Sequence, residues 1–517
     1  MKDNLKEGVR MERTFKTKEL QYNVFHSRKP NEERMVLVAD AICGAGKTQA
    51  AIEYINTAPR HCKFLYVTPY LEEIDRIKKS CPTAHFCSPD LYRGKGSKMS
   101  DFQELFDRGE NIVCTHALFK MFTPDNFKIA EAYGYTLIMD EVADVVCKYE
   151  YQTSNLYNIL NPEFDYISID EKTNQIIMNK EKDFFERNFT TQQLKRMWGE
   201  NGLDLLEKIK NGCIFLYDTS WKDLKKFYEQ GGTIDDFKVT LLMWSFPVNI
   251  FKSFEKVFII TYMFEGQTQA NYYKYFDVPF KYLHTEEVPV ETLQAEFTEH
   301  PSIPIQYKFD IETRAPRFQF VDAVFDSPQL PNYSKLKSLI EICDKEKLNN
   351  IGDFEKVNGK TKKSALCKAW YINNLGGKNE TAKTLTNNTY NYFYNVCKQK
   401  NSENLIWTTY KDFRNLLKKS PFSKESCFVS CTARAINKFK ERHYCAYLIN
   451  VYYDPFIRKF FERKDIETKE DVYALSELIQ WLFRSAIRAD EKIYVYIPSE
   501  RMRSLLQTWL DGNFIYW

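Results

Sequence analysis

The sequence predicts an α/β protein with two units built on parallel sheets, plus an inserted subdomain and a basic helical segment. Short apolar runs recur in both halves of the 517-residue chain, a long polar and aromatic stretch interrupts the first half, and lysines crowd one segment between the halves. At 44% hydrophobic content the chain can bury several cores, and its length favours two to four domains.

The first unit is predicted over residues 1–282 from five apolar runs. They are "MVLVA" at 35–39, "KFLYVT" at 63–68, "NIVCT" at 111–115, "YTLIMD" at 135–140 and "KVFIIT" at 256–261. Each run is continuous rather than alternating in polarity, as expected of strands covered on both faces in a parallel sheet. The stretch at about 150–240 is too long for a strand-to-helix connection and is predicted to be an inserted subdomain.

A change in the pattern of polar and apolar residues separates the two halves of the chain. Residues 283–330 are predicted to be a β-rich junction, because polarity alternates at period two around a turn-like "TRAP". Residues 331–403 are expected to be a basic helical segment, with nine lysines against a single glutamate between 356 and 400. Aromatic residues are interleaved with them: Trp370, Tyr371, Tyr390, Tyr392, Phe393 and Tyr394. Such a segment suits a nucleic-acid surface, but a solvated lysine face over core aromatics explains it equally well.

The second unit is predicted over residues 404–517, where the strand pattern resumes. Its runs are "NLIWTT" at 404–409, "SCFVSCT" at 426–432, "CAYLINVYY" at 445–453 and "KIYVYIP" at 492–498.

Composition restricts the partners and the compartment. Lys plus Arg is 73 against 70 for Asp plus Glu, so the net charge of +3 indicates no acidic partner by itself. None of the 13 cysteines forms a CxxC pair, which favours reduced thiols in a cytosolic protein. The charged N-terminus and the absence of a membrane-length apolar window lead us to expect a soluble, cytoplasmic protein without a membrane partner.

A phosphate-binding loop is predicted at "AICGAGKT", residues 41–48, between the first strand and a helical pattern. Gly44 and Gly46 provide flexible backbone, Lys47 provides an ammonium for phosphates, and Thr48 provides a hydroxyl for Mg²⁺. Ala41 stands where the strict pattern has glycine, a place that needs only a small side chain. The alternative is an ordinary strand-to-helix turn.

An acidic pair follows the fourth apolar run. In "TLIMDEVADV", Asp140 is expected to hold Mg²⁺ through water, and Glu141 to polarise the water that attacks a nucleotide. The competing interpretation is a charged helix start after a strand. Together with the loop, the pair predicts nucleotide hydrolysis.

Two arginines share one stretch near the C-terminus. In "QWLFRSAIRADE", Gln480, Arg484 and Arg488 are spaced four apart, which predicts that all three lie on one helical face. The arginines would repel each other unless an anion sat between them, and a triphosphate that bridges the two units is such an anion. A surface salt-bridge helix is the alternative.

In these motifs the sequence resembles the superfamily 2 helicases. "DEVAD" at 140–144 is similar to their DEAD or DEAH box, and Ala41 to Thr48 match their first motif, where the alanine is usual. "VTPYLEEIDRI" at 67–77 resembles motif Ia, "VCTHALF" at 113–119 motif Ic, "IWTTYKDF" at 406–413 motif IV and "SCTARAIN" at 430–437 motif V. Thr261 sits at the place of motif III, although it departs from the usual Ser-Ala-Thr.

The resemblance implies two RecA-like domains, with ATP and Mg²⁺ as cofactors. It implies that Gln480 contacts the nucleotide and that Arg484 and Arg488 serve as arginine fingers. Because Phe483 replaces a usual glycine and the arginine spacing differs, the arginine that reaches the γ-phosphate stays open. Contacts to a nucleic-acid backbone are implied for Thr68, Tyr70, Thr115, His116, Thr408, Lys411, Thr432 and Arg434.

The function expected from this resemblance is an ATP-dependent helicase or translocase on single-stranded or forked nucleic acid. Residues 474–488 and 493–506 resemble the compact helicases of bacteriophages, which favours DNA in replication or recombination and proteins of those processes as partners. The alternatives are a DNA-packaging or remodelling ATPase that does not unwind, a partner-activated ATPase, and a nucleotide-regulated binding module.

Overall fold

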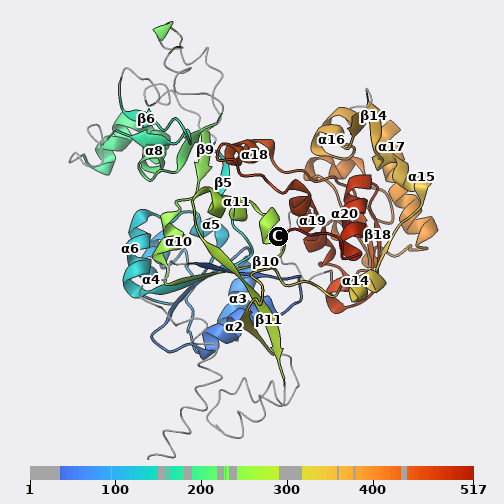
Figure 1. The fold of residues 1–517 in the computed structure, drawn as a ribbon, viewed down its shortest axis with the longest axis horizontal. Coiled ribbons are helices and arrows are strands. Elements are labelled where there is room, and N and C mark those ends of the chain that lie inside the picture. The colour runs from blue at the N-terminus through green and yellow to red at the C-terminus, as the bar shows by residue number, and fades with distance from the viewer. Residues whose placement is uncertain are drawn as a thin grey trace, which may run out of the picture.

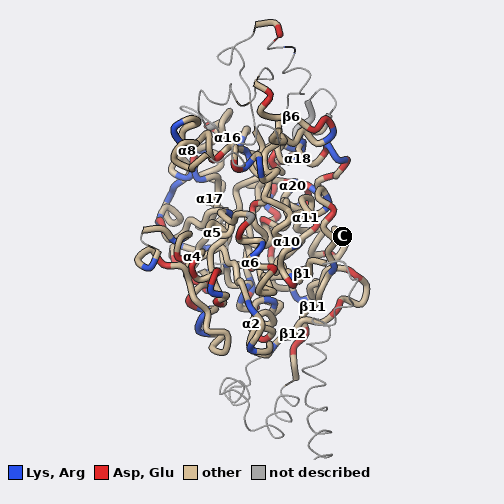
Figure 2. The backbone as a smooth tube through the Cα atoms, turned by 90° about the vertical axis from the view of Figure 1, so that its left-hand side faces the viewer, with Lys and Arg blue, Asp and Glu red and all other residues tan. Residues whose placement is uncertain are grey.

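The computed structural model contains two α/β units with an insertion that extends from the first (Figure 1). It describes residues 35–94, 96–149, 159, 164–179, 189–217, 226, 229–231, 242–289, 317–357, 360–375, 380–431 and 439–517. Within these ranges no helix is both long and apolar enough to cross a membrane. Lys and Arg are interspersed with Asp and Glu along the backbone in Figure 2.

Seven described strands form the first sheet, in the order β12-β11-β1-β10-β4-β2-β3. In chain order they are β1 (Val36–Asp40), β2 (Lys63–Thr68), β3 (Ile112–Thr115), β4 (Tyr135–Asp140), β10 (Lys256–Thr261), β11 (Phe280–Val288) and β12 (Arg317–Asp322). All neighbours are parallel except β11 and β12. The five apolar runs of the first half are therefore confirmed as strands of a parallel sheet.

Both faces of this sheet are covered, which explains why its strands are continuously apolar. Val36 and Val38 of β1 belong to one core, whereas Leu37 and Ala39 point into the other. The second core is closed by α2 (Lys47–Thr57) and α3 (Leu71–Ser80). The first is closed by α4 (Lys98–Asp107), α5 (His116–Phe119), α6 (Pro124–Tyr133), α10 (Asn249–Ser253) and α11 (Thr268–Tyr275) (Figure 1).

The predicted junction at 283–330 needs correction. Strand β11 crosses the expected boundary at 282 and pairs in parallel with β1, and β12 pairs with β11 in antiparallel register. These strands extend the first sheet because each satisfies backbone groups at an otherwise open edge. The first arm of the predicted hairpin lies outside the described residues.

The insertion is tied to the first unit by a stem of paired strands. β5 (Val146–Tyr149) pairs antiparallel with β9 (Leu242–Ser245), and β8 (Ile214–Leu216) completes this small sheet. Beyond it lie the hairpin β6 (Ile167–Ile169) and β7 (Ile176–Met178) and the kinked helix α8 (Thr191–Lys210). The stem explains why the insertion begins and ends close together.

The second sheet is parallel throughout its described strands, in the order β13-β18-β17-β16. They are β13 (Ile340–Ile342), β16 (Leu405–Thr408), β17 (Tyr444–Tyr447) and β18 (Ile493–Tyr496). The helices around it are α14 (Tyr333–Leu339), α15 (Glu346–Asn349), α16 (Lys368–Leu375), α17 (Glu380–Asn391), α19 (Glu470–Leu482) and α20 (Glu500–Leu510). Helix α18 (Pro455–Glu462) packs instead against α11 and β5 of the first unit. A hairpin of β14 (Glu355–Val357) and β15 (Lys360–Lys362) follows α15.

Two expectations for the second half are corrected. The basic segment is not separate, because β13 is an edge strand of the second sheet and α14 packs beside α20, so this unit starts near residue 333. The described part of the predicted strand at 426–432, residues 426–431, is not a strand: a 3₁₀ turn, Glu425–Cys427, precedes a single bridge between Phe428 and Trp407. Its apolar residues instead fill the core, where Cys427 and Val429 are buried.

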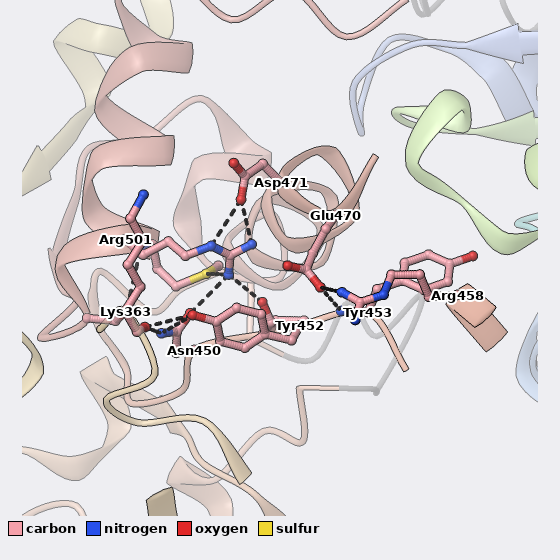
Figure 3. A network of polar contacts seen from close by, with 11 residues as sticks. Lys363, Asn450, Tyr452, Tyr453, Arg458, Glu470, Asp471 and Arg501 are labelled. Carbon is pink, nitrogen blue, oxygen red and sulfur yellow. Dashed lines mark hydrogen bonds and ion pairs between the residues drawn. The ribbon is translucent and has the colours of Figure 1, made fainter. Parts of the chain in front are cut away.

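A polar network around the buried Arg501 ties the segment at Lys363 to the rest of the second unit (Figure 3). Its guanidinium pairs with Asp471 of α19 and donates to Asn450 Oδ1 at 3.0 Å. The Asn450 amide donates in turn to the carbonyl of Lys363 at 2.8 Å. The segment is thereby fixed to the helix that leads into the site described below.

The two units meet through the turn after β10. Gln267 Nε2 donates to Ser476 Oγ on α19 at 2.7 Å, and Ser476 Oγ donates to the carbonyl of Tyr262 at 3.2 Å. A Cβ on Gly266 would lie 2.6 Å from the Tyr473 amide nitrogen, so glycine allows this close approach. A second contact comes from α18, where Phe460 stacks on Tyr275 at 4.8 Å.

Candidate active site

A pocket of about 310 Å³ lies between the two units and collects residues from both. The first unit contributes Cys43, Gly44, Gly46, Lys47, Thr48, Gln49, Glu73, Arg76, Asp140 and Glu141; the second contributes Gln480, Phe483, Arg484 and Arg488. The structure therefore brings together the predicted nucleotide-site residues, except Ala41, which is buried beneath the loop.

The loop between β1 and α2 needs its glycines. Gly44 and Gly46 have φ of 89° and 80°, values that residues with a Cβ rarely adopt. A Cβ on Gly46 would also lie 2.2 Å from the ring of Phe318 on β12. The Lys47 ammonium donates to the carbonyls of Ala41 and Ile42. The loop thus wraps around this ammonium, at the N-terminus of an 11-residue helix.

The acidic pair stands at the carboxyl end of β4. The Glu141 amide donates to Ile260 O at 2.8 Å, and this residue has a left-handed φ of 67°. Tyr66 donates to Asp140 Oδ2 at 3.1 Å, and the Thr261 hydroxyl donates to Glu141 Oε2 at 3.5 Å. Burial, and then the neighbouring Glu141, raise the pKa of Asp140 to about 6.

Asp40 is a further acidic residue of this region that sequence reasoning missed. It ends β1 fully buried and accepts the amides of Met263 and Phe264 at 2.7 and 2.8 Å. Burial raises its pKa to about 7, against the effect of these two hydrogen bonds and of Lys47. The carboxylate holds the turn after β10 against the strand that leads into the loop. The signal in the sequence was an acidic residue that ends an apolar run.

The predicted single helical face for Gln480, Arg484 and Arg488 is wrong. Helix α19 ends at Leu482, Arg484 lies in the following turn, and Arg488 lies in the 3₁₀ turn η8 (Ala486–Ala489). All three still line the pocket, because the turn folds the chain back toward it. Gln480 is oriented by a 3.3 Å hydrogen bond from its Nε2 to Ser476 Oγ.

The two arginines differ in their surroundings. Arg484 is 4% exposed, and its Nη1 donates to Ser430 O at 3.0 Å. Its Nε has no hydrogen-bond partner among the described residues, and burial lowers the pKa of the guanidinium. A buried cation with an unused donor is costly unless an anion binds it. Arg488 is exposed and lines the same pocket.

The predicted nucleic-acid contacts differ in how far their side chains are accessible to a ligand. Thr68 and Thr408 are fully buried, which argues against direct contacts from these two side chains. The Thr115 hydroxyl accepts the Leu118 amide at 3.4 Å, and His116 Nε2 lies 3.0 Å from the Asp140 carbonyl oxygen.

Four further candidates divide by their placement. Tyr70 is half-buried and Lys411 is exposed, so both can face a ligand. Thr432 and Arg434 lie outside the described residues.

The aromatic residues of the basic segment serve mainly as core. Tyr371, Tyr392 and Phe393 are at most 2% exposed and pack beneath the second sheet, as the alternative interpretation expected. Tyr390 and Tyr394 are half-buried and stack on each other at 5.1 Å, with Lys419 4.4 Å from the ring of Tyr390.

Replacing Asp140 by asparagine is expected to stabilise the nucleotide-free protein. A carboxyl whose pKa rises from 3.8 to about 6 on folding makes the free energy of unfolding fall as pH rises through that window. At pH 8 the neutral variant should therefore be more stable by on the order of 1 kcal/mol, because asparagine still accepts from Tyr66. Urea unfolding at pH 8 and pH 4.5 measures this. A variant that is less stable than wild type at pH 8 would contradict the assigned cause.

The donor set suits a hard cation held together with a ligand. Among the described residues no three His, Cys, Asp or Glu side chains are placed to hold a metal alone. The oxygens of Thr48 and Asp140 are the ligand type that Mg²⁺ prefers when phosphates complete its shell. All thirteen cysteines fall in the described ranges and are free thiols.

Two RecA-like domains with parallel sheets define the class of this protein. A family model for the YonV C-terminal Rossmann-like domain matches residues 334–510. The SPbeta prophage-derived uncharacterized protein YonV of Bacillus subtilis (strain 168) is 32% identical over 481 residues, 92% of this chain and 99% of that protein. The chain belongs to the YonV family.

Two solved structures match most of this chain at low identity. An apo XPD structure covers 93% of this chain and 95% of its own, with 12% identity and a TM-score of 0.44. The structure of S. tokodaii Xpd4 covers 98% of each chain, with 10% identity and a TM-score of 0.38.

Proposed function

We propose that this YonV-family protein is an ATP-driven motor on nucleic acid, a helicase or translocase of superfamily 2. The observation that carries the proposal is the shared pocket. Lys47, Asp140 and Glu141 line it from one RecA-like domain, and Arg484 and Arg488 line it from the other. A nucleotide bound there touches both domains, so its hydrolysis changes how they fit together.

The first domain would hold the nucleotide phosphates. The Lys47 ammonium exchanges its contacts with the Ala41 and Ile42 carbonyls for phosphate oxygens, assisted by the N-terminus of α2. Thr48 and Asp140 would hold Mg²⁺, which neutralises charge on the phosphates.

Glu141 would orient the attacking water. Its backbone is fixed by the hydrogen bond from its amide to Ile260 O, and its carboxylate accepts a hydrogen bond from the Thr261 hydroxyl. A carboxylate so placed at the pocket can accept a proton from water as the water attacks the terminal phosphate.

The turn after β10 would transmit the change between domains. Asp40 fixes this turn to β1, and Gln267 links it to Ser476, which also contacts Gln480. A shift of α19 relative to this turn moves the segment that carries Arg484 and Arg488. Each ATP cycle would thus open and close the two domains along a strand.

We propose DNA as the track, in phage replication or recombination, with proteins of those processes as partners. The prophage origin of YonV supports the phage setting. Tyr70 and Lys411 are two predicted contacts that are not buried, one from each domain. Contacts of this kind are made to the backbone, so sequence preference should be low.

Translocation is the property that separates this proposal from its alternatives. We expect the purified chain with ATP and Mg²⁺ to displace streptavidin from one end of a biotinylated single-stranded oligonucleotide. Displacement together with strand separation on a forked duplex would identify a helicase, whereas displacement without it would identify a translocase that does not unwind, as expected of a packaging or remodelling ATPase. Hydrolysis without displacement would favour a partner-activated ATPase, and tight ATP binding without phosphate release would favour a nucleotide-regulated module.

A further inference from the structure

Arg76 is a cation of the pocket that neither the P-loop nor the C-terminal arginines account for. It lies on α3, one turn after Glu73, and both side chains line the pocket with Lys47 and Asp140. Its Nε donates to Glu73 Oε2 at 2.6 Å, and 42% of its side chain is exposed. An ordinary surface pair at this spacing contributes little to stability. A contribution to stability therefore does not explain why Arg76 lines the pocket.

The charges around the pocket show what Arg76 faces. Lys47, Arg76, Arg484 and Arg488 are set against Glu73, Asp140 and Glu141. Arg76 is near enough to Asp140 to lower the pKa of that carboxyl, whereas Glu73 raises it. Arg76 thus lines the same pocket as the carboxylate proposed to hold Mg²⁺ and lies within range of its charge.

We propose that Arg76 contacts the terminal phosphate of the bound nucleoside triphosphate, and that Glu73 holds its guanidinium until the phosphate arrives. The first domain then carries its own sensor for a triphosphate, in addition to the arginines of the second. This inference rests on the proposed function, because it assumes that the pocket binds ATP.

The exchange is chemically favourable. A guanidinium forms paired hydrogen bonds to a phosphate as readily as to a carboxylate, and the phosphate carries more charge. The ion pair between Glu73 and Arg76 joins two side chains of the same helix, so Glu73 can release the guanidinium without unfolding α3. A diphosphate lacks the group that Arg76 would bind. The residue should therefore discriminate ATP from ADP.

The test compares affinities for a non-hydrolysable ATP analogue and for ADP, both with Mg²⁺, by calorimetry. Arg76→Ala should weaken the affinity for the analogue about 10-fold or more, the size expected for a lost charged hydrogen bond. It should leave the affinity for ADP within about 2-fold of the wild-type value. Lys79→Ala removes a positive charge from the same helix outside the pocket and should change neither affinity. Equal loss for both nucleotides, or no loss beyond that of Lys79→Ala, would overturn the inference.

A double-mutant cycle tests the role of Glu73. Glu73→Gln should tighten the analogue about 3-fold, because it frees the guanidinium, and this gain should vanish in the Arg76→Ala background. If Glu73→Gln still raised the affinity in the absence of Arg76, Glu73 would act on the phosphate directly by charge repulsion. The proposed transfer of the Arg76 guanidinium from Glu73 to the phosphate would then be wrong. If the wild-type chain binds no nucleotide, the proposed function fails with the inference; if it binds ATP and Arg76→Ala is silent, the inference alone fails.

Discussion

Lys47→Ala is expected to reduce ATP hydrolysis by on the order of 10³-fold while the protein stays folded, because the variant loses the ammonium that we propose to bind the phosphates. The side chain is 9% exposed, and its bonds to Ala41 and Ile42 carbonyls are local to the loop, so their loss should leave both cores unchanged. Steady-state phosphate release measures the effect, with a circular-dichroism melt as the check of folding.

The matched control is Lys128→Ala, which removes an exposed lysine on α6 that does not line the pocket. It should hydrolyse ATP at the wild-type rate. If Lys47→Ala retained full activity with an unchanged melt, the assignment of the phosphate site would be wrong.

Arg488→Ala is expected to slow hydrolysis by on the order of 10³-fold with little change in nucleotide affinity. Arg488 is exposed, so it can approach the phosphates as the domains close and act mainly on the transition state. Arg484 is buried and held by Ser430 O, so it is part of the pocket before and during the reaction. Arg484→Ala should therefore weaken nucleotide binding as well as turnover.

Separate measurement of affinity and maximal rate distinguishes the two arginines. Arg488→Lys should recover little activity, because an ammonium lacks the paired donors of a guanidinium. Arg60→Ala, at an exposed site after α2, serves as the control and should match wild type. Loss of affinity in Arg488→Ala, with normal turnover at saturation, would reverse these assignments.

The sequence predicted most of the fold because its strands are covered on both faces. A run such as "YTLIMD" has to be apolar throughout to fit between two layers of helices, so the run itself marks β4. Edge strands carry no such signal: β11 and β12 mix polar and apolar residues and were assigned to a junction. The 426–432 run was misassigned because an apolar segment that fills a core without pairing has the same composition as a strand.

The pocket was foreseen better than the local structure that forms it. The spacing of Arg484 and Arg488 suggested one helix, but the chain turns at Phe483 and brings both residues to the pocket by another route. Asp40 and Arg76 were missed because their roles depend on long-range packing. Asp40 accepts hydrogen bonds from amides more than two hundred residues away in the sequence. Arg76 reaches the pocket from a helix whose sequence is typical of a solvated surface.

The rate of ATP hydrolysis by the wild-type chain, with and without single-stranded DNA, tests whether this protein is a nucleic-acid motor. We expect strong stimulation by single-stranded DNA, less by duplex DNA, and weakening of the effect as salt rises, because backbone contacts release counterions. Hydrolysis at the same rate with and without any nucleic acid would contradict a nucleic-acid motor.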